Sequence, residues 1–417
     1  MREILTRGRL TRARCGTRRR IARARMRACA RAAVESDAFE VMRARAREFG
    51  ASTVVETLAN ADASVEALDA ARALAHDALH CGRWDEVDER WRAVYALATI
   101  RWVAESGVGK RESMRALDLA CVLGGETFGD AARRAIEIAR ASVGEVEETR
   151  EGMWDRGVDL SSVSLAMGEG SWTERRAHAE TAMETFYRDF MAKRDDDASD
   201  WRDPGSPVVL VGLAAHWPAI SKWRDRAYLD AVIGDRLVPI EIGKTYVDER
   251  WSQKLMTVRE FMDEYLGDDE NKDIGYLAQH ELFQQCPELR RDIETPLYCS
   301  LGSGAPCAVN AWFGPANTES PAHTDPKHNL LCQIVGVKRV RLFAPDQTPK
   351  MYPREAPSSN TSRVDVMAPD LDEFPLFADA KFVDAILAPG DALYIPPGWW
   401  HRVAAETPSF SVSFWWD

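Results

Sequence analysis

Residues 320–329, "SPAHTDPKHN", place a histidine and an aspartate two positions apart, at His323 and Asp325. Pro326 follows and pushes Asp325 toward an extended backbone. In an extended chain, residues two apart project from the same face, so both side chains can approach one metal ion. The pair is a weak signal by itself, and a metal site needs at least one more ligand.

The third ligand is available in "GDALYIPPGWWHRV", residues 390–403, where a turn leads into a β-rich run and His401 follows two prolines and a glycine. Two imidazoles and one carboxylate on one face of a metal form the facial triad of non-haem Fe(II) oxygenases, which leaves positions open for a cosubstrate and dioxygen. Zinc accepts the same ligands, so a zinc hydrolase is an alternative.

Lys338, in "VGVKRVRLF", separates these two possibilities. Strand alternation places Lys338 on the same face as Val340 and Leu342, so a lysine faces an apolar interior. A buried ammonium group needs an anion beside it, because an unpaired buried charge is costly. The distal carboxylate of 2-oxoglutarate supplies that anion, whereas a zinc hydrolase has no use for the lysine.

The elements around these residues are predicted to be short strands separated by Gly, Pro and Asp turns, which is typical of a barrel or sandwich. Segments such as "TVREFMDEYL" and "HELFQQCPELRRDI" have helical patterns and are expected to cover the outside of the sheets. The predicted class is α+β with a jelly-roll core. The apolar runs that indicate strands are "PVVLVGL", "RLVPIEIG", "VNAWFG", "NLLCQIVG", "KRVRLFAP", "AILAPGDALYIP" and "SFSVSFWW".

Residues 35–150 have a different pattern. They are rich in Ala, Leu, Glu and Arg, they contain no proline from about residue 36, and their apolar residues recur three and four positions apart. We predict a helical domain there, a bundle that is repeat-like without a clean period. Residues 151–205 are expected to form a linker and an entry helix, and 206–417 the domain that carries the metal site.

Composition limits the class of protein. The chain has 417 residues, 45% hydrophobic and 29% charged, which is ordinary for a globular protein of two or three domains. No apolar run is long enough to span a bilayer as a helix. Eight cysteines occur without a CxxC pair, which favours a reducing compartment over a disulfide framework.

Charge is distributed unevenly. Residues 1–34 hold twelve Arg and one acid, a net +11, so the remaining chain carries −23 within the overall −12. An Arg- and Ala-rich leader is compatible with organelle targeting, nuclear import, contact with nucleic acid or simple disorder, and we expect it to be disordered. The acidic remainder repels nucleic-acid phosphates and attracts basic peptides, so no direct grip on nucleic acid by the main body is expected.

With these residues in place, the sequence resembles the Jumonji-C (JmjC) Fe(II)- and 2-oxoglutarate-dependent oxygenases. Within them it is similar to the JmjC domain-containing protein five group, also called lysine demethylase eight. Nearly all of 206–417 carries the resemblance, and the helical "LHCGRWDEVDERWRAVYALATIRW" matches that group's N-terminal domain more loosely. The matching segments are "AAHWP", "DERWSQKLMTVREF", "YLAQHELF", "NAWFGP", "RVDVMAPDLDEFP" and "SFSVSFWW".

The resemblance implies a role for each matching residue. His323, Asp325 and His401 correspond to the catalytic iron ligands. The positions that hold 2-oxoglutarate are Tyr276, Ser320, Asn329 and Lys338. The positions that contact a cationic substrate side chain are Glu241, Tyr246, Trp312 and Trp415, through carboxylate pairing and cation–π contact.

The resemblance also implies the reaction: 2-oxoglutarate and dioxygen are consumed while a C–H bond of a protein substrate is oxidised. The family has been assigned arginine hydroxylation, demethylation of methyl-lysine on histone H3 and, for some members, histone-tail cleavage. We rank arginine hydroxylation first and methyl-lysine demethylation second, on a basic protein or histone tail, in the nucleus and cytoplasm. The helical domain is expected to bind partner proteins. A cupin-like binding module without catalysis is the non-enzymatic alternative.

Overall fold

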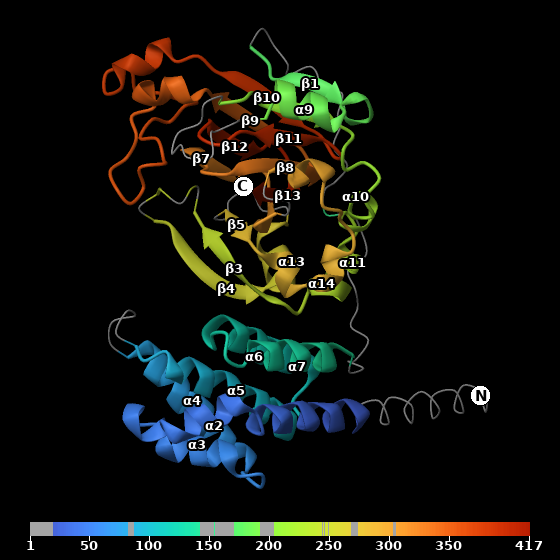
Figure 1. Ribbon diagram of the computed structural model, residues 1–417, viewed down its shortest axis with the longest axis vertical. Helices are drawn as coiled ribbons and strands as arrows, with labels where there is room; N and C mark the ends of the chain where they lie inside the picture. Colours follow the sequence, from blue (N-terminus) through green and yellow to red (C-terminus); the bar gives the residue numbers. More distant parts are fainter. Residues whose placement is uncertain are drawn as a thin grey trace, which may run out of the picture. The chain divides into compact units, whose positions relative to one another are not determined.

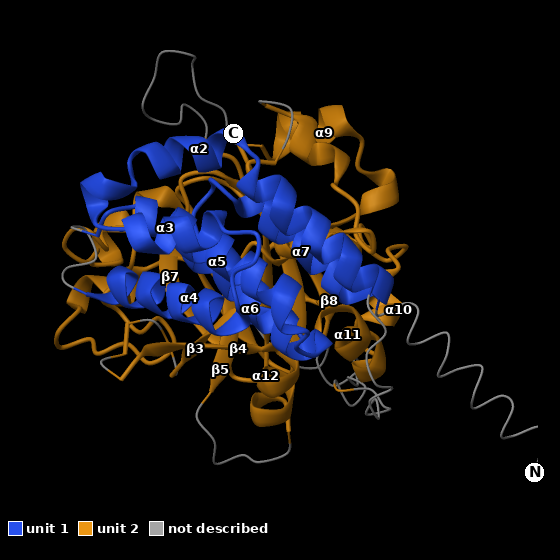
Figure 2. Cartoon of the chain, turned by 90° about the horizontal axis from the view of Figure 1, so that it is seen from below, with its two compact units in different colours: residues 1–148, 235–237 blue, residues 149–234, 238–417 orange. Residues whose placement is uncertain are grey.

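The computed structural model describes residues 20–81, 87–141, 154, 171–191, 204–243, 245, 247–248, 250–267, 274–302 and 306–417. The chain divides into two compact units, one of residues 1–148 with 235–237 and the other of residues 149–234 with 238–417 (Figure 2). Among the described helices, none combines the length and apolar character needed to cross a membrane.

The first unit is helical (Figure 1). Its helices span residues 20–34, α2 Asp37–Ala44, η1 Ala46–Phe49, α3 Ser52–Ala59, α4 Val65–His80, α5 Arg90–Ser106, α6 Lys110–Leu123 and α7 Gly129–Ala141. Serine N-caps begin two of them, because the Ser36 and Ser64 hydroxyls accept hydrogen bonds from backbone N–H groups of α2 and α4. Gly107, with φ of 69°, ends α5 in the left-handed conformation that glycine adopts without strain.

Helix α5 forms the centre of this unit. Every residue from Ala93 to Ala104 is buried, and α5 packs against α3, α4, α6 and α7. A helix that is buried on all sides needs apolar residues all around its surface, which the run "AVYALATIRWVA" provides. The charged exception is Arg101, whose guanidinium donates to the carbonyl oxygens of Leu58 and Asn60 near the end of α3.

The expectation of a disordered leader is wrong for its second half. Residues 20–34 form a helix, and Met26, Ala30 and Ala33 are buried in the core of the helical unit. These three residues recur at four- and three-residue spacing, which gives an arginine-rich helix one apolar face. Residues 1–19 lie outside the described residues.

The second unit contains two β-sheets. One has the strand order β1-β2-β11-β8-β13-β6-β5-β3-β4 and the other β10-β9-β12-β7. The strands are β1 Glu174–Ala177, β2 Val208–Val211, β3 Leu237–Ile242, β4 Ser252–Thr257, β5 Gly275–His280, β6 Ala308–Gly314, β7 Glu319–Thr324, β8 His328–Val335, β9 Lys338–Phe343, β10 Val383–Leu387, β11 Ala392–Ile395, β12 Trp400–Ala405 and β13 Ser409–Trp416. Several neighbouring pairs, such as β11 with β8 and β13 with β6, are far apart in sequence, as in a jelly roll, and this confirms the predicted fold class.

Strand β13 shows how the larger sheet separates two environments. Phe410, Val412 and Phe414 lie in the core that the larger sheet shares with helices on its outer side. The alternating residues include Ser413, which lines the cavity between the two sheets. A smaller apolar cluster, which includes Val340 of β9, fills the rest of that space.

Helices accompany the sheets, as the sequence predicts. They are η2 His178–Glu180, α9 Met183–Asp189, α10 Ala219–Lys222, α11 Arg226–Ile233, α12 Val258–Tyr265, α13 Leu282–Gln285, α14 Pro287–Arg290, η3 Leu297–Ser300, η4 Pro345–Lys350 and η5 Pro375–Asp379. Helix α12 begins with a complete capping box, in which Thr257 and Glu260 bond each other's backbone N–H. The predicted entry helix within 151–205 corresponds in position to α9.

The connection between β9 and β10 folds onto the smaller sheet. Its residues Met351, Val364 and Phe377 join an apolar cluster with Ala322 of β7 and Trp400 of β12. Part of the connection also hydrogen-bonds to β7, since the Thr324 N–H donates to the carbonyl of residue 360 at 2.8 Å and the N–H of residue 362 to the Ala322 carbonyl at 2.8 Å. Strand β7 is therefore held on both edges, by β12 and by this segment.

Candidate active site

The two predicted histidine ligands face each other across adjacent strands. His323 on β7 and His401 on β12 are direct partners in the antiparallel register, and their ring centroids lie 4.3 Å apart. Asp325 follows β7, and its carboxylate oxygens lie 3.7 Å from His323 Nε2 and 3.5 Å from His401 Nε2. The three residues offer ligand atoms that all lie within 4.8 Å of one another, a cluster able to hold one metal ion.

Hydrogen bonds orient each ligand. His323 Nδ1 lies 2.8 Å from the Pro321 carbonyl and His401 Nδ1 lies 3.0 Å from the Trp399 carbonyl. Because a carbonyl only accepts, both Nδ1 atoms carry the proton, and both Nε2 atoms present a lone pair to the metal position. The Asn329 amide donates to Asp325 Oδ2 at 3.1 Å, which fixes the carboxylate.

The electrostatics favour metal binding. Burial, with the neighbouring His323 adding to it, lowers the pKa of His401 to about 4, so the His401 imidazole is neutral at physiological pH. A neutral imidazole is the form that coordinates a metal. The backbone of Asp325 is held as well, because the Gly398 N–H donates to its carbonyl at 2.9 Å, which ties the turn before β12 to the ligand.

A small cavity that is partly open to solvent connects this cluster to Lys338. Lys338 is 1% exposed, and its Nζ donates to the Tyr276 hydroxyl at 3.2 Å. Burial lowers the pKa of Lys338 to about 7, and burial, with Glu241 adding, raises the pKa of Tyr276. The residues that line this cavity are Tyr276, Trp312, Ser320, His323, Asp325, Asn329, Leu331, Lys338, Ile395, His401, Val403, Ser413 and Trp415.

The chemistry of the groups that line the cavity suits a metal ion with a dicarboxylate beside it. Two imidazoles and a carboxylate with an open face are the donor set of a non-haem Fe(II) site. Two cavity-lining residues also keep a buried polar atom that has no hydrogen-bond partner among the described residues, Asn329 Oδ1 and Trp415 Nε1. Buried polar atoms are normally satisfied, so these atoms and the Lys338 ammonium indicate a polar occupant.

The residues predicted to contact the substrate divide into three groups. Trp312 and Trp415 line the cavity, and the Trp312 indole N–H donates to the Ser413 hydroxyl at 2.9 Å. Glu241 does not line the cavity; it lies on β3 opposite Tyr276 of β5. Tyr246 lies outside the described residues.

Glu241 is nevertheless close enough to the site to influence it. Its negative charge raises the pKa of Tyr276 in addition to burial, and its own carboxylate accepts a hydrogen bond from the Trp251 indole at 3.3 Å. Burial raises the pKa of Glu241, and the Trp251 hydrogen bond opposes that rise. A partly buried carboxylate with one hydrogen-bond donor is able to pair with a cation.

Several residues around the cavity were not among those predicted from the sequence. Ser413 could have been found, because the alternation in "SFSVSFWW" places it on the same strand face as Trp415. The apolar residues Leu331, Ile395 and Val403 also line the cavity, but in the sequence nothing distinguishes them from other apolar residues of strands. Thr361, which pairs with His323 from the connection between β9 and β10, has no local signal at all.

Comparisons with known proteins agree with this geometry. Residues 198–417 match the cupin-like domain family, and residues 32–152 match the N-terminal ARM repeats of proteins like lysine demethylase eight. The zebrafish (Danio rerio) protein named lysine-specific demethylase 8 is 38% identical over 354 residues, which cover 81% of this chain and 84% of the zebrafish protein. The chain belongs to the JmjC family of cupin-like oxygenases.

Other members of the family are similar over different lengths. The Drosophila melanogaster Jumonji C domain-containing protein 5 is 49% identical over 222 residues, which cover 52% of this chain and 55% of the fly protein. The Arabidopsis thaliana lysine-specific demethylase JMJ30 is 36% identical over 379 residues, which cover 84% of this chain and 86% of the Arabidopsis protein. The family uses Fe(II) and 2-oxoglutarate, and the His, Asp and His cluster is a group of residues that could hold such a metal ion.

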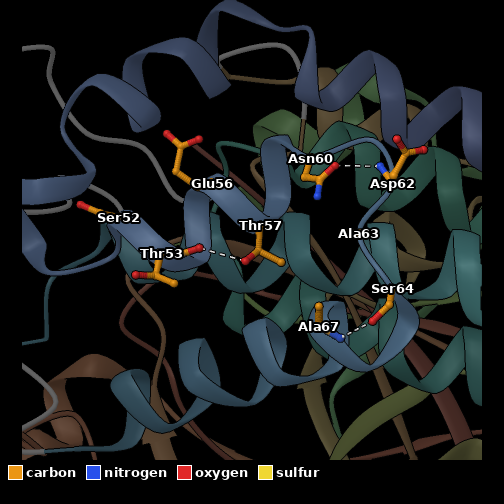
Figure 3. A pocket seen from close by; sticks show the side chains of 9 residues that line it. All are labelled: Ser52, Thr53, Glu56, Thr57, Asn60, Asp62, Ala63, Ser64 and Ala67. Atoms are coloured by element: carbon orange, nitrogen blue, oxygen red, sulfur yellow. Dashed lines mark hydrogen bonds between the residues drawn. The ribbon is translucent and has the colours of Figure 1, made fainter.

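A second hollow lies in the helical unit, between α3 and the start of α4 (Figure 3). Its polar groups serve local structure: the Thr57 hydroxyl donates to the Thr53 carbonyl, the Asn60 side chain accepts from the Asp62 N–H, and Ser64 caps α4. We assign it no chemistry. The residues that line it are Ser52, Thr53, Glu56, Thr57, Asn60, Asp62, Ala63, Ser64 and Ala67.

Proposed function

We propose that this JmjC oxygenase oxidises a C–H bond in a cationic side chain of a protein substrate. The observation that carries the proposal is the buried Lys338, which shares one cavity with the three metal-ligand residues. A lysine in that position favours a dicarboxylate cosubstrate beside the metal, because an ammonium ion buried away from water needs an anionic partner.

Each part of the cavity has a defined task in this proposal. His323, Asp325 and His401 hold Fe(II), and Lys338 with Tyr276 binds the distal carboxylate of 2-oxoglutarate. Bound iron supplies the redox chemistry that couples decarboxylation of 2-oxoglutarate, giving succinate and carbon dioxide, to transfer of one oxygen atom of dioxygen into the substrate C–H bond. The second oxygen atom enters succinate.

The remaining protein groups position the substrate and exclude water. The Trp312 and Trp415 rings form part of the cavity wall, and Ser413 holds the Trp312 indole in place. Aromatic faces attract cations, so a lysine or arginine side chain entering here is stabilised over these rings. The acidic character of the chain beyond residue 34 adds long-range attraction for a basic substrate.

The names of the relatives support methyl-lysine demethylation as the outcome of this oxidation. Proteins similar over most of their length, from zebrafish and from Arabidopsis, are named lysine-specific demethylases. Hydroxylation of an N-methyl group gives an unstable hydroxymethyl amine, which breaks down to formaldehyde and the free amine. The comparisons therefore favour the reaction that we ranked second from sequence, and the same family names support a nuclear site of action.

Arginine hydroxylation is the second candidate, and Glu241 is the observation that favours it. A planar guanidinium group pairs well with a carboxylate and stacks on flat aromatic faces. Glu241 lies beside Tyr276, and Trp312 and Trp415 supply aromatic faces in the adjoining cavity. Hydroxylation on carbon within arginine would leave a stable alcohol.

One experiment distinguishes these outcomes. The purified chain is incubated with Fe(II), 2-oxoglutarate and basic peptides that contain either methyl-lysine or arginine, and the products are weighed by mass spectrometry. Loss of one methylene with release of formaldehyde identifies demethylation, whereas gain of one oxygen atom on arginine peptides identifies hydroxylation. The Asp325→Ala variant is the control for iron-independent oxidation. If none of the basic peptides changes the rate of succinate formation, the proposal of a basic protein substrate is contradicted.

A further inference from the structure

The helix of residues 20–34 is part of the folded helical unit, and its exposed face is positively charged. Its apolar face, with Met26, Ala30 and Ala33, lies in the core of the helical unit. Five arginines on the same helix are exposed: Arg20, Arg23, Arg25, Arg27 and Arg31. No acidic residue occurs between position 4 and position 34, so nothing within the helix neutralises them.

Two of these arginines have structural partners. Arg27 Nη2 forms an ion pair with the Glu105 carboxylate at 2.6 Å. Arg23 donates to the Glu105 carbonyl in the last turn of α5, where a cation is favoured by the helix dipole. In the described part of the chain, Arg20, Arg25 and Arg31 have no ion pair.

The exposed surface of the helix has a definite pattern. Ala24, Ala28 and Ala32 are exposed and recur every four residues, so they form a ridge of small side chains along the helix. At 100° per residue, Arg31 lies on one side of this ridge and Arg25 on the other, while Arg20, four residues before Ala24, lies at its N-terminal end. A ridge of methyl groups with guanidinium groups on both sides allows a charged polymer to approach closely.

Helix α7 contributes one more arginine. Arg134 is exposed and lies against the thiol of Cys29, whose Sγ also approaches the Ala131 carbonyl at 3.5 Å. Cys29 is one turn beyond Arg25, so Arg134 extends the charge on that side of the ridge. We call Arg20, Arg25, Arg31 and Arg134 the arginine face.

The chemistry of the arginine face fits a polyphosphate. An anionic membrane would require an exposed apolar stripe, but the apolar side of this helix is buried and Ile21 is its exposed large apolar residue. An acidic protein would need apolar anchors to fix its position, and the ridge offers alanine methyl groups only. A nucleic-acid backbone binds through charge alone, and guanidinium groups bind phosphate in a bidentate manner.

We propose that the arginine face binds the phosphate backbone of nucleic acid without base specificity. The arginines of residues 1–19 have the same charge and add to this attraction. The acidic remainder of the chain repels the same phosphates, so contact is confined to this face. Binding at this face of the helical unit does not depend on the oxygenase activity.

The test measures binding of the full-length chain to a short fluorescein-labelled DNA duplex by anisotropy at a series of salt concentrations. Four phosphate contacts predict that the logarithm of the association constant falls with the logarithm of salt concentration with a slope of about −3 to −4. The triple variant R20Q/R25Q/R31Q should weaken binding and make the slope shallower by about three. Gln keeps the helix propensity, and circular dichroism checks the fold of each variant.

A matched control changes the net charge equally. Arg45, Arg47 and Arg250 are exposed arginines outside the arginine face, and R45Q/R47Q/R250Q should leave DNA binding unchanged. Equal losses in both triple variants would overturn the proposal, because binding would then follow net charge. Loss of binding in R12Q/R14Q/R18Q with none in R20Q/R25Q/R31Q would also overturn it, because the contact would then lie in residues 1–19.

Parallel titrations identify the class of partner. A single-stranded RNA of the same length should bind in the same salt-dependent way if phosphate is the feature recognised. Vesicles that contain phosphatidylserine, and polyglutamate, test an anionic membrane and an acidic polypeptide. Binding to either of these with none to DNA or RNA would overturn the assignment to nucleic acid.

Discussion

Replacing Lys338 by methionine should raise the stability of the free protein and weaken its binding of 2-oxoglutarate. Burial lowers the pKa of Lys338 from 10.5 to about 7. At about 1.4 kcal/mol per pKa unit, that difference disfavours the charged lysine in the free cavity by on the order of 5 kcal/mol. Methionine has a similar length and no charge, so this cost disappears in the variant.

The pH dependence of stability gives the sign of this effect. The folded-state pKa of Lys338 lies below the unfolded value, so the unfolded chain binds more protons between about pH 7 and pH 10.5. The lysine therefore destabilises the fold increasingly as pH falls through that range, and its effect is constant below about pH 7. Lys338→Met should be more stable than the original protein by about 1–4 kcal/mol at neutral pH, with a smaller difference near pH 10.

The same substitution should weaken the affinity for 2-oxoglutarate. Removing one partner of a buried ion pair costs about 3–5 kcal/mol, so the dissociation constant should rise roughly a hundred-fold or more. In the original protein the affinity should also fall as pH rises above about 7, because Lys338 must then take up a proton when the carboxylate binds. The methionine variant should lack that dependence.

Urea unfolding across pH and calorimetric titration with 2-oxoglutarate test both effects. Arg339→Met is a suitable control, because Arg339 lies on the same strand but on the opposite face, where it pairs with Glu406. The control should keep its affinity for 2-oxoglutarate. Unchanged affinity in Lys338→Met, or equal loss in both variants, would refute the assignment of Lys338 as the carboxylate partner.

Four further changes test other parts of the structure. His323→Ala should abolish succinate formation and leave the melting temperature within a few degrees, because the apolar cores are untouched; undiminished turnover would remove it from the metal site. Glu241→Gln should weaken peptide-stimulated turnover more than peptide-independent turnover. In the original protein, lowering the pH toward the raised pKa of Glu241 should have the same selective effect, because a protonated carboxyl group no longer pairs with a cation. Trp415→Phe removes the unpaired indole N–H and should weaken the affinity for 2-oxoglutarate, measured by calorimetric titration, about ten-fold. Equal affinity in the variant would show that the indole N–H does not bond the molecule in the cavity. Met26→Ala should lower the free energy of unfolding by about 2–5 kcal/mol in urea, whereas Ile21→Ala, at a half-exposed position, should change it little; equal effects would mean that Met26 is not part of the core.

The sequence alone predicted the features that depend on local rules. The alternation in "KRVRLF" predicted an inward-facing Lys338, and the structure buries it with Val340 and Leu342. The alternation holds because successive side chains of any strand point to opposite faces. The residue types of the triad, together with the resemblance to JmjC oxygenases, were sufficient to name a metal site and its cofactor.

The strands that carry the two predicted histidine ligands were harder to recognise in the sequence than the strands around them. Strand β7, "ESPAHT", is mostly polar, and in β12, "WHRVAA", a histidine and an arginine interrupt the apolar residues, so neither stood out as an apolar run. Their pairing, with His401 opposite His323, joins segments far apart in the chain. Only the sheet order places them side by side, because non-local pairing leaves no periodic signal within either segment.

Glu241 and the leader show what only the tertiary structure decided. Strand order places β3 beyond β5, so Glu241 lies beside Tyr276, one strand farther from the cavity and outside its lining, a position that no local pattern of β3 specifies. The composition of residues 1–34 indicated disorder, because an arginine-rich chain cannot bury enough apolar surface by itself. The helical unit supplies the missing surface, and burial of Met26, Ala30 and Ala33 against other helices makes residues 20–34 part of the fold.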